Sequence, residues 1–154
     1  MFYNKLQEQL IRVKLDKQIA YYVKLASFDN ENIILDTLAS KLLTQNCILF
    51  IDGTGVKDFY FAEIVNKIKQ LCSQFFGTLI IKQRADIVLL SEADGILLDK
   101  DSITPNEAQS LLGETTIVGA IGNSEDEHIS FRIIDKKITS NFIGKDIGVI
   151  ELKP

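Results

Sequence analysis

Two hydrophobic patterns alternate along most of the chain. Short apolar runs rich in β-branched and aromatic residues are typical of buried strands, and apolar residues spaced three and four apart are typical of amphipathic helices. The expected strands lie at 18–25, 47–51, 78–81, 95–98 and 116–121. The expected helices lie at 30–43, 58–76, 85–91 and 104–112. Because strands and helices take turns, the pattern predicts a parallel sheet with right-handed helical crossovers.

The predicted helices have recognisable ends. Asp29 or Asn30 can cap the helix that follows the first strand. Thr104 and Glu107 have the spacing of a capping box, and Gly77 is the expected C-cap of the long helix. A further amphipathic helix is expected at residues 3–16, with an apolar side formed by Leu6, Leu10, Ile11 and Val13.

The alternation ends near residue 122. Residues 128–134 and 147–152 are expected to form strands, with 136–144 between them. A closed (β/α)8 barrel would need three more strand–helix units, for which this tail is too short. We therefore expect a single α/β domain with an incomplete TIM-barrel-like fold, in which about five parallel βα-type strands precede a divergent, β-rich C-terminal tail. Its parts are an N-terminal helix at 1–17, the βα units at 18–123 and the tail at 124–154.

Composition narrows the function classes. The chain has 154 residues, of which 46% are hydrophobic and 25% charged, and this balance argues against disorder. The net charge of −4 and the scarcity of arginine argue against nucleic-acid binding. The first residues lack the apolar core of a signal peptide, and no apolar run has the length of a membrane span. We therefore expect a cytoplasmic protein that binds neither nucleic acid nor membrane.

Cysteine and histidine are too few for a zinc site. Cys47 and Cys72 lie on apolar patterns, as expected for reduced, buried thiols. With one histidine they do not supply four zinc ligands. That histidine, His128, lies in an acidic stretch without an identifiable catalytic partner, and a solvated surface position is expected for it.

Polar residues follow the predicted strands at the edge where α/β proteins place their sites. Asp52 is either a base or a metal ligand, or it simply forms an Asp-Gly turn; a receiver-type phospho-acceptor is disfavoured because the first strand ends without acidic residues. Lys82 and Arg84 are candidates for contacting an anionic ligand, unless Arg84 pairs with Asp86 or Glu92 at the surface.

A glycine pattern ends the last of the five predicted strands. Gly119, Gly122 and Asn123 can present backbone N–H groups to a phosphate, or they can mark a plain transition from strand to turn. A Gly-x-x-Gly spacing does not decide between these two interpretations.

The stretch from residue 79 to residue 123 resembles thiamine phosphate synthase and its TenI-like relatives. In that family a strand ending L-I-I-N-D-R-x-D precedes a short helix, and the motifs A-D-G-V-H-L-G-Q-E-D-L-P, E-A-R-x-L-L-G and I-I-G-x-S-T follow. The corresponding segments here are 79–86, 93–103, 107–113 and 117–122. Residues 18–77 fit the family's first two βα units more weakly, and nothing after about residue 124 matches. The resemblance implies a barrel of the thiamine phosphate synthase type.

Most residues to which the resemblance assigns chemistry are replaced. The family's Asn-Asp pair, which contacts pyrophosphate and magnesium, corresponds to Lys82 and Gln83. A second metal-contacting Asp corresponds to Ser102, beside Asp101, and these two stay candidates together with Asp52. A departing pyrophosphate needs a metal ion or fixed cations, and Mg²⁺ binds through carboxylates and phosphate oxygens. No metal or other cofactor is therefore expected.

Three functions stay open at this point. The first is a diverged family member without the magnesium-dependent activity, which binds a small phosphorylated or other anionic ligand, or a protein partner. The second is an active transferase of thiamine biosynthesis, acting on a pyrimidine diphosphate and a thiazole phosphate and completed by another chain. The third is a regulatory binding module unrelated to thiamine. An incomplete barrel leaves open strand edges, so we expect a homo-oligomer, most simply a dimer, that covers them.

Overall fold

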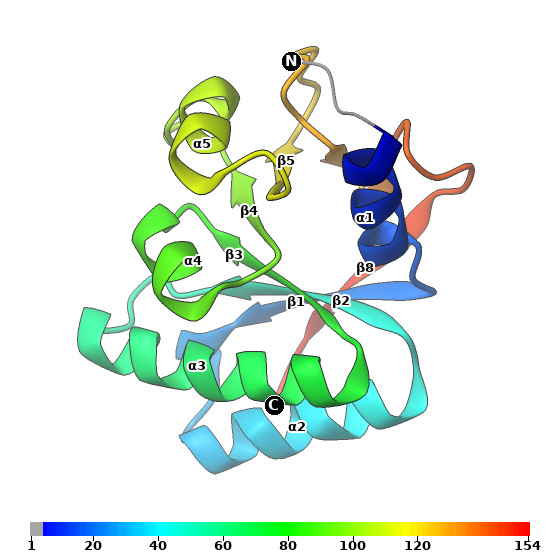
Figure 1. Ribbon diagram of the computed structural model, residues 1–154. Helices are drawn as coiled ribbons and strands as arrows, with labels where there is room; N and C mark the ends of the chain where they lie inside the picture. The colour runs from blue at the N-terminus through cyan, green and yellow to red at the C-terminus, as the bar shows by residue number, and fades with distance from the viewer. Residues whose placement is uncertain (1–4) are drawn as a thin grey trace.

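Five parallel strands and the helices between them form the first part of the fold, as the hydrophobic pattern predicts. The computed structural model describes residues 5–154, and Figure 1 shows helices α2 to α5 outside the sheet. The strands are β1 (Ile19–Lys24), β2 (Cys47–Asp52), β3 (Thr78–Lys82), β4 (Gly95–Leu98) and β5 (Ile117–Ile121). The helices are α1 (Lys5–Leu15), η1 (Leu25–Ser27), α2 (Glu31–Thr44), α3 (Asp58–Phe75), α4 (Ala85–Ser91) and α5 (Pro105–Leu112).

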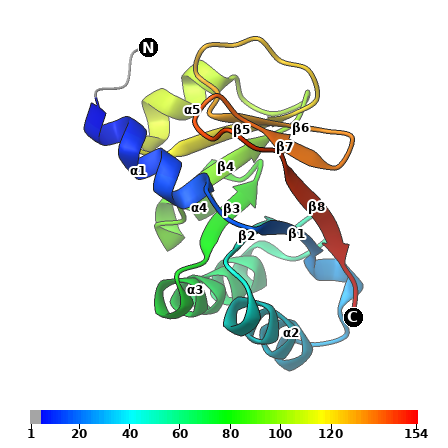
Figure 2. The ribbon, with the colours of Figure 1, turned by 90° about the vertical axis from the view of Figure 1, so that its right-hand side faces the viewer.

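The C-terminal tail closes the sheet into a barrel, so the expectation of an incomplete barrel with open edges is wrong. The tail forms β6 (Phe131–Ile134), β7 (Lys137–Thr139) and β8 (Ile147–Leu152). Strands β5 and β6 are parallel, β7 is antiparallel to both of its neighbours, and β8 pairs in parallel with β1. Antiparallel neighbours need only a short turn, whereas parallel neighbours need a long crossover. The turns around β7 therefore need no helix, and the parallel step from β5 to β6 runs through the loop at residues 122–130, so the tail supplies the missing strands without helices, as Figure 2 shows.

The barrel interior is filled by side chains that alternate along the strands. Phe50 of β2 and Phe131 of β6 are fully buried there, with ring centroids 5.7 Å apart. Gly119 of β5 lies directly beside the Phe131 ring, and a Cβ atom at residue 119 would overlap that ring. The interior cluster also contains Ala20, Ile48, Ile80, Leu97, Ile117, Ile138 and Ile147. A closed sheet with a filled interior removes the reason for which a covering second copy was expected.

Helix α1 packs on the interior cluster with a different face from the one predicted. Ile11 and Leu15 are fully buried in that cluster, whereas Leu6, Leu10 and Val13 are exposed. Residues four apart lie on one face of a helix, so the buried face contains the pair Ile11 and Leu15. Lys14, near the C-terminal end of α1, also makes two polar contacts with the sheet. Its carbonyl accepts from Thr78 Oγ1 over 2.6 Å, and its Nζ lies 2.7 Å from Oδ1 of Asp94, which precedes β4.

The predicted helix starts are confirmed, and one predicted helix end is wrong. Asn30 caps α2 by accepting from the Ile33 N–H, and Thr104 with Glu107 forms the capping box of α5. The residue with positive φ that ends α3 is Phe76 (φ 59°), not Gly77. Gly77 instead lets the chain approach the Leu42 side chain closely, where a Cβ atom would not fit.

The expected burial of both cysteines is confirmed. Cys47 and Cys72 are both buried and free, and burial raises the pKa of both thiols. Between residues 5 and 154 no helix combines the length and the apolar character needed to cross a membrane.

Candidate ligand-binding site

Inward-facing residues at the carboxyl ends of the strands surround a cavity of about 610 Å³. Alternate residues of a strand point to the same side, and the interior residues Ala20, Phe50 and Ile80 are followed two positions later by Tyr22, Asp52 and Lys82. These three side chains therefore lie one layer above the barrel core and line the cavity. Its volume is within the usual range for small-molecule sites, and its position is the end of the barrel at which such folds bind ligands.

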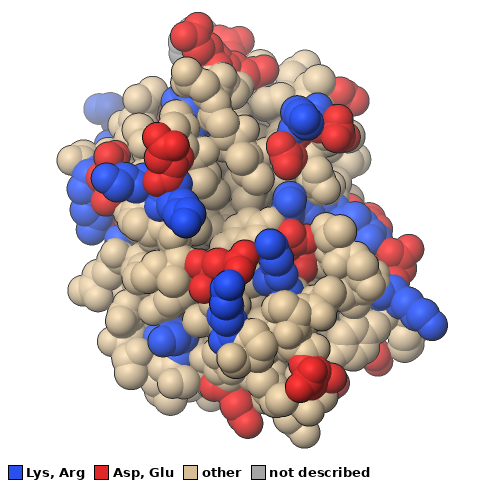
Figure 3. Space-filling model, turned by 180° about the vertical axis from the view of Figure 1, so that it is seen from behind, with Lys and Arg blue, Asp and Glu red and all other residues tan. Residues whose placement is uncertain are grey.

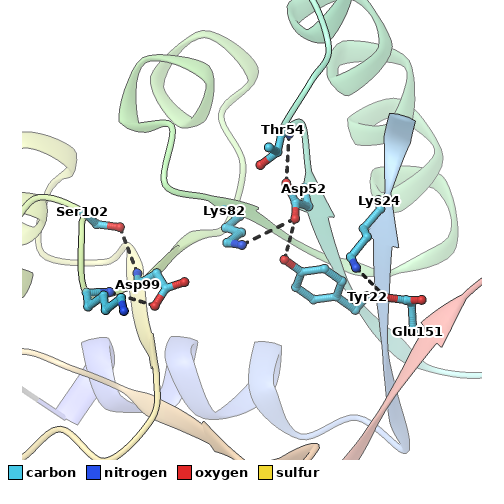
Figure 4. A network of polar contacts seen from close by, with 9 residues as sticks. Tyr22, Lys24, Asp52, Thr54, Lys82, Asp99, Ser102 and Glu151 are labelled. Atoms are coloured by element: carbon cyan, nitrogen blue, oxygen red, sulfur yellow. Dashed lines mark hydrogen bonds and ion pairs between the residues drawn. The ribbon is translucent and has the colours of Figure 1, made fainter. Parts of the chain in front are cut away.

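Asp52 is the centre of the polar network at this mouth (Figure 4). Its Oδ2 accepts a hydrogen bond from Tyr22 Oη over 2.7 Å and lies 3.5 Å from Lys82 Nζ. Its Oδ1 accepts from the Thr54 backbone N–H over 2.9 Å. The ammonium of Lys82 also lies 5.8 Å from the centre of the Tyr22 ring. The bond from Thr54 shows that Asp52 forms the expected turn, and its side chain also lines the cavity.

The surroundings fix the protonation states of this network. Burial acts to raise the pKa of Asp52, but hydrogen bonds from Thr54 and Tyr22 and the charge of Lys82 outweigh it, so the pKa falls below its usual range. Burial, followed by the hydrogen bond to Asp52, raises the pKa of Tyr22 well above its usual range. At neutral pH the carboxylate is therefore ionised and the phenol stays protonated as a donor.

Two further lysines reach the cavity from other strands. Lys24 Nζ lies 3.1 Å from Glu151 Oε1 of β8, and both side chains are partly exposed at the rim. Lys136 lies in the turn between β6 and β7, and no carboxylate among residues 5–154 forms an ion pair with it. Three cations and two carboxylates thus line the mouth. On the face drawn in Figure 3, basic and acidic side chains are similarly interspersed.

One side of the cavity is apolar. It is lined by Ile121 of β5, Ile133 of β6, and Val149 and Ile150 of β8. The site therefore combines a polar wall on β1 to β3 with an apolar wall on β5, β6 and β8. A cavity of this kind suits a small organic molecule with an apolar body and a charged group.

The residues predicted from sequence are only partly brought together. Asp52 and Lys82 line the 610 Å³ cavity. Arg84 lines a smaller cavity of about 180 Å³ on the other side of Asp52. Its guanidinium is held by Asp86 over 2.8 Å and by Asp58 over 2.9 Å, so the alternative in which Arg84 forms surface ion pairs describes it better.

The glycine pattern does not form a phosphate cradle. Gly119 is buried against Phe131 in the barrel interior. Gly122 has a φ of +92°, and its N–H donates to the Ile133 carbonyl over 2.9 Å, so that donor is used within the sheet. Asn123 is exposed next to it. The strand-to-turn interpretation therefore describes this segment.

The loop after β4 lies beside the network but is occupied with its own turn. Ser102 Oγ accepts from the Asp99 N–H over 2.9 Å, and Asp101 is exposed. Asp99 is close enough to Tyr22 for its charge to contribute to the raised pKa of the phenol. Figure 4 shows Asp99 and Ser102 on the far side of Lys82 from Tyr22.

Sequence reasoning missed Tyr22, Lys24, Lys136 and Glu151. For the first two the signal was present, because the period of two that places Ala20 inside also places residues 22 and 24 inside. For Lys136 and Glu151 it was absent, since an open tail gave no reason to bring residues 124–154 to the mouth.

His128 departs from its predicted solvated position. Its side chain is 18% exposed, and Nδ1 lies 2.9 Å from Asp126 Oδ1. It lines a separate cavity of about 340 Å³ next to the end of α5, away from the residues of the mouth.

The chain matches proteins of one family. Its residues 28–138 match the family model described as thiamine monophosphate synthase. The thiamine-phosphate synthase of Nostoc sp. is 33% identical over 94 residues, which cover 61% of this chain and 27% of that relative. The thiamine-phosphate synthase of Campylobacter jejuni is 27% identical over 106 residues, covering 69% of this chain and 50% of the relative.

A solved structure shares the fold. The thiamine phosphate pyrophosphorylase from Pyrococcus furiosus superposes with a TM-score of 0.61 at 18% identity, over 74% of this chain and 53% of that one. This chain therefore spans about half, or less, of the length of the relatives it matches. Since the family model covers most of the sequence, the chain belongs to the thiamine monophosphate synthase family.

Proposed function

We propose that this chain is a diverged member of its family that binds a small anionic organic ligand in the mouth of the barrel and lacks the magnesium-dependent displacement of pyrophosphate. The single observation that carries the proposal is the position of Lys82. Its ammonium lies 3.5 Å from the Asp52 carboxylate, where the resemblance assigns a residue that contacts pyrophosphate and magnesium.

The residues of the mouth do not fit a magnesium ion. Mg²⁺ is held by carboxylates and phosphate oxygens in octahedral geometry. The carboxylate of Asp52 is already satisfied by Tyr22, Thr54 and Lys82, and the fixed ammonium would repel a dication there. Within residues 5–154 there is no cluster of three His, Cys, Asp or Glu side chains that could hold a metal. The proposal therefore contains no step that runs through a metal.

The walls of the cavity support the class of ligand. The lysines on β1, β3 and the β6–β7 turn exceed the lining carboxylates by one, so the mouth favours an anion. The apolar wall of β5, β6 and β8 favours an organic body over a bare inorganic ion. A small phosphorylated or carboxylated compound with an apolar ring or chain meets both conditions.

Binding is tested directly with simple probes. Isothermal titration calorimetry with phenyl phosphate should show binding, with weaker binding of inorganic phosphate and of phenol. Lys82→Met should weaken phenyl phosphate by about tenfold, the value of a charge-assisted hydrogen bond. Lys145→Ala, which removes an exposed lysine paired with Asp16 away from the mouth, is the matched control and should bind as the native chain does. Absence of binding to all three probes would overturn the proposal.

The family membership favours one competing function, an active synthase, because the relatives are named thiamine-phosphate synthases. Incubation of the chain with a pyrimidine diphosphate, a thiazole phosphate and Mg²⁺ tests it, with pyrophosphate release as the readout. We expect no release above a no-protein control. Turnover by the native chain that is lost in Lys82→Met would show that this lysine replaces the metal-contacting residue in function. It would refute the proposal that the chain lacks the pyrophosphate-displacing activity.

A further inference from the structure

Lys136 differs from the other cations of the mouth in that it forms no ion pair with any carboxylate among residues 5–154. An anion that binds Lys24 or Lys82 competes with Glu151 or Asp52, which already lie 3.1 Å and 3.5 Å from these ammonium groups. No carboxylate of the described chain holds Lys136 in the same way. A ligand anion can therefore contact Lys136, which is exposed at the rim, without displacing a protein carboxylate.

The backbone at Lys136 is in a conformation that its sequence does not favour. Ile134 pairs with Lys137, so Asp135 and Lys136 form a two-residue hairpin turn. Both have positive φ, 50° and 60°, which is the geometry of a type I′ turn. Such turns strongly favour Asn-Gly, and a lysine in the left-handed region is strained. The Val149 N–H, which donates to the Lys136 carbonyl over 2.8 Å, ties this turn to β8.

The turn places the lysine at the edge where the cavity opens. Strand β6 is parallel to β5, so the β6–β7 turn lies at the same end as the carboxyl ends of β1 to β5. Lys136 lines the cavity together with Ile133 and Val149, which belong to the apolar wall. The Lys136 backbone serves the fold through its bond to Val149, but its side chain forms no ion pair among the described residues and lines the cavity. A residue in strained backbone that presents a cation to a cavity has the features of a functional position.

Resting on the proposed function, we infer that Lys136 receives the anionic group of the ligand, whose apolar body lies against Ile133 and Val149. A phosphate offers several acceptor oxygens to an ammonium donor at the rim, while the body is removed from water. Lys82, which lines the same cavity from β3, contributes a second contact to the same anionic group. The residue that recognises the charged group then belongs to the tail at 124–154. This tail lies outside residues 79–123, which resemble the family most closely.

Two variants distinguish the effect of the Lys136 charge from the effect of backbone strain in the turn. Asn tolerates the left-handed region better than Lys or Asp, so Lys136→Asn and Asp135→Asn should each raise Tm, by up to about 2–4 °C for a chain of this size. Only Lys136→Asn removes the cation, and it should weaken phenyl phosphate by about tenfold while leaving phenol unchanged. Asp135→Asn should bind phenyl phosphate at least as tightly as the native chain.

A third variant controls for long-range charge. Lys137→Gln removes one positive charge from the same hairpin, but Ile138 next to it points into the barrel, so Lys137 lies on the outer face. It should change phenyl phosphate affinity by less than about twofold. Calorimetry and thermal unfolding of the four proteins supply both readouts.

The outcomes distinguish the two proposals. If the native chain binds phenyl phosphate and Lys136→Asn binds it equally well, Lys136 is not the anion-receiving residue, and the proposed function stands. If Lys137→Gln weakens binding as much as Lys136→Asn, the effect is general electrostatics and the assignment also fails. If the native chain binds no probe, the proposed function itself fails.

Discussion

Tyr22 Oη donates a 2.7 Å hydrogen bond to Asp52 Oδ2 and so joins the carboxyl ends of the neighbouring strands β1 and β2. Tyr22 and Asp52 face the same side of the sheet at the same level, because each lies two residues beyond an interior side chain of its strand. The bond fixes the carboxylate that in turn holds Lys82. The cation of the polar wall is therefore positioned by a contact between two other strands.

Tyr22→Phe removes this donor and leaves the ring in place. We expect the free energy of unfolding to fall by about 1.5–3 kcal/mol, the range for a hydrogen bond to a charged group. Urea unfolding measures the loss. Tyr21→Phe is the matched control, since Tyr21 Oη makes only a long 3.4 Å bond to Gln45. An equal loss in both variants would contradict a special role for the bond to Asp52.

The lowered pKa of Asp52 predicts how stability depends on pH. Burial opposes the shift, but hydrogen bonds from Thr54 and Tyr22 and the charge of Lys82 outweigh it, so the pKa in the folded chain lies below the ordinary 3.8. A depressed folded pKa stabilises the protein above the unfolded value, and this contribution is lost as the pH falls through the folded pKa. Native chain and Asp52→Asn should therefore differ most near pH 7.

The comparison is made by urea unfolding of both proteins between pH 7 and pH 3. The difference in unfolding free energy should stay constant down to about pH 4 and shrink below it, because the other acidic groups are common to both proteins. A difference that stays unchanged down to pH 3 would show that Asp52 does not titrate as its contacts indicate.

Gly119 is predicted to be essential for packing rather than for binding. In Gly119→Ala the new methyl group overlaps the Phe131 ring, and we expect a loss of about 1–3 kcal/mol from overpacking. The double variant with Phe131→Leu should recover part of that loss. Gly148→Ala is the control, because a Cβ atom there meets nothing within 4 Å. Chemical denaturation measures the free energy of unfolding of the four proteins. A Gly119→Ala variant as stable as the native chain would contradict the predicted overlap.

The two faces of α1 are predicted to differ sharply in energy. Ile11→Ala should cost about 2–5 kcal/mol, because Ile11 is fully buried against the barrel interior. Leu6→Ala should change stability by less than about 0.5 kcal/mol, since Leu6 is 69% exposed. Thermal unfolding of the two variants distinguishes this packing from the one expected from the helical pattern. Equal effects would mean that α1 packs by both faces.

The sequence predicted what depends on local signals. The strand β4 and the helix α4 lie at the predicted residues, and Thr104 caps α5 as its spacing indicates. Short apolar runs and capping residues act within a few positions, so they can be read without the fold.

What depends on distant partners was not predictable from those signals. Strand β7 has only three residues, and it exists because β6 and β8 pair with it on both sides. The buried face of α1 is chosen by the barrel interior, not by the helix itself. Lys136 reaches the candidate site through the pairing of β6 with β5, and Glu151 reaches it through the pairing of β8 with β1.

The pairing of β8 with β1 also has a consequence for the order of folding. Ala20 pairs with Val149 and Val23 with Leu152, so strands near opposite ends of the sequence become neighbours. Contacts between such distant segments bear a large loop-closure entropy and form slowly. The βα units can assemble through local contacts first, and the ring of hydrogen bonds then closes in one late step. Kinetically, the complete binding site and the completed barrel should appear together, because Val149 and Glu151 of β8 reach the mouth only at that step.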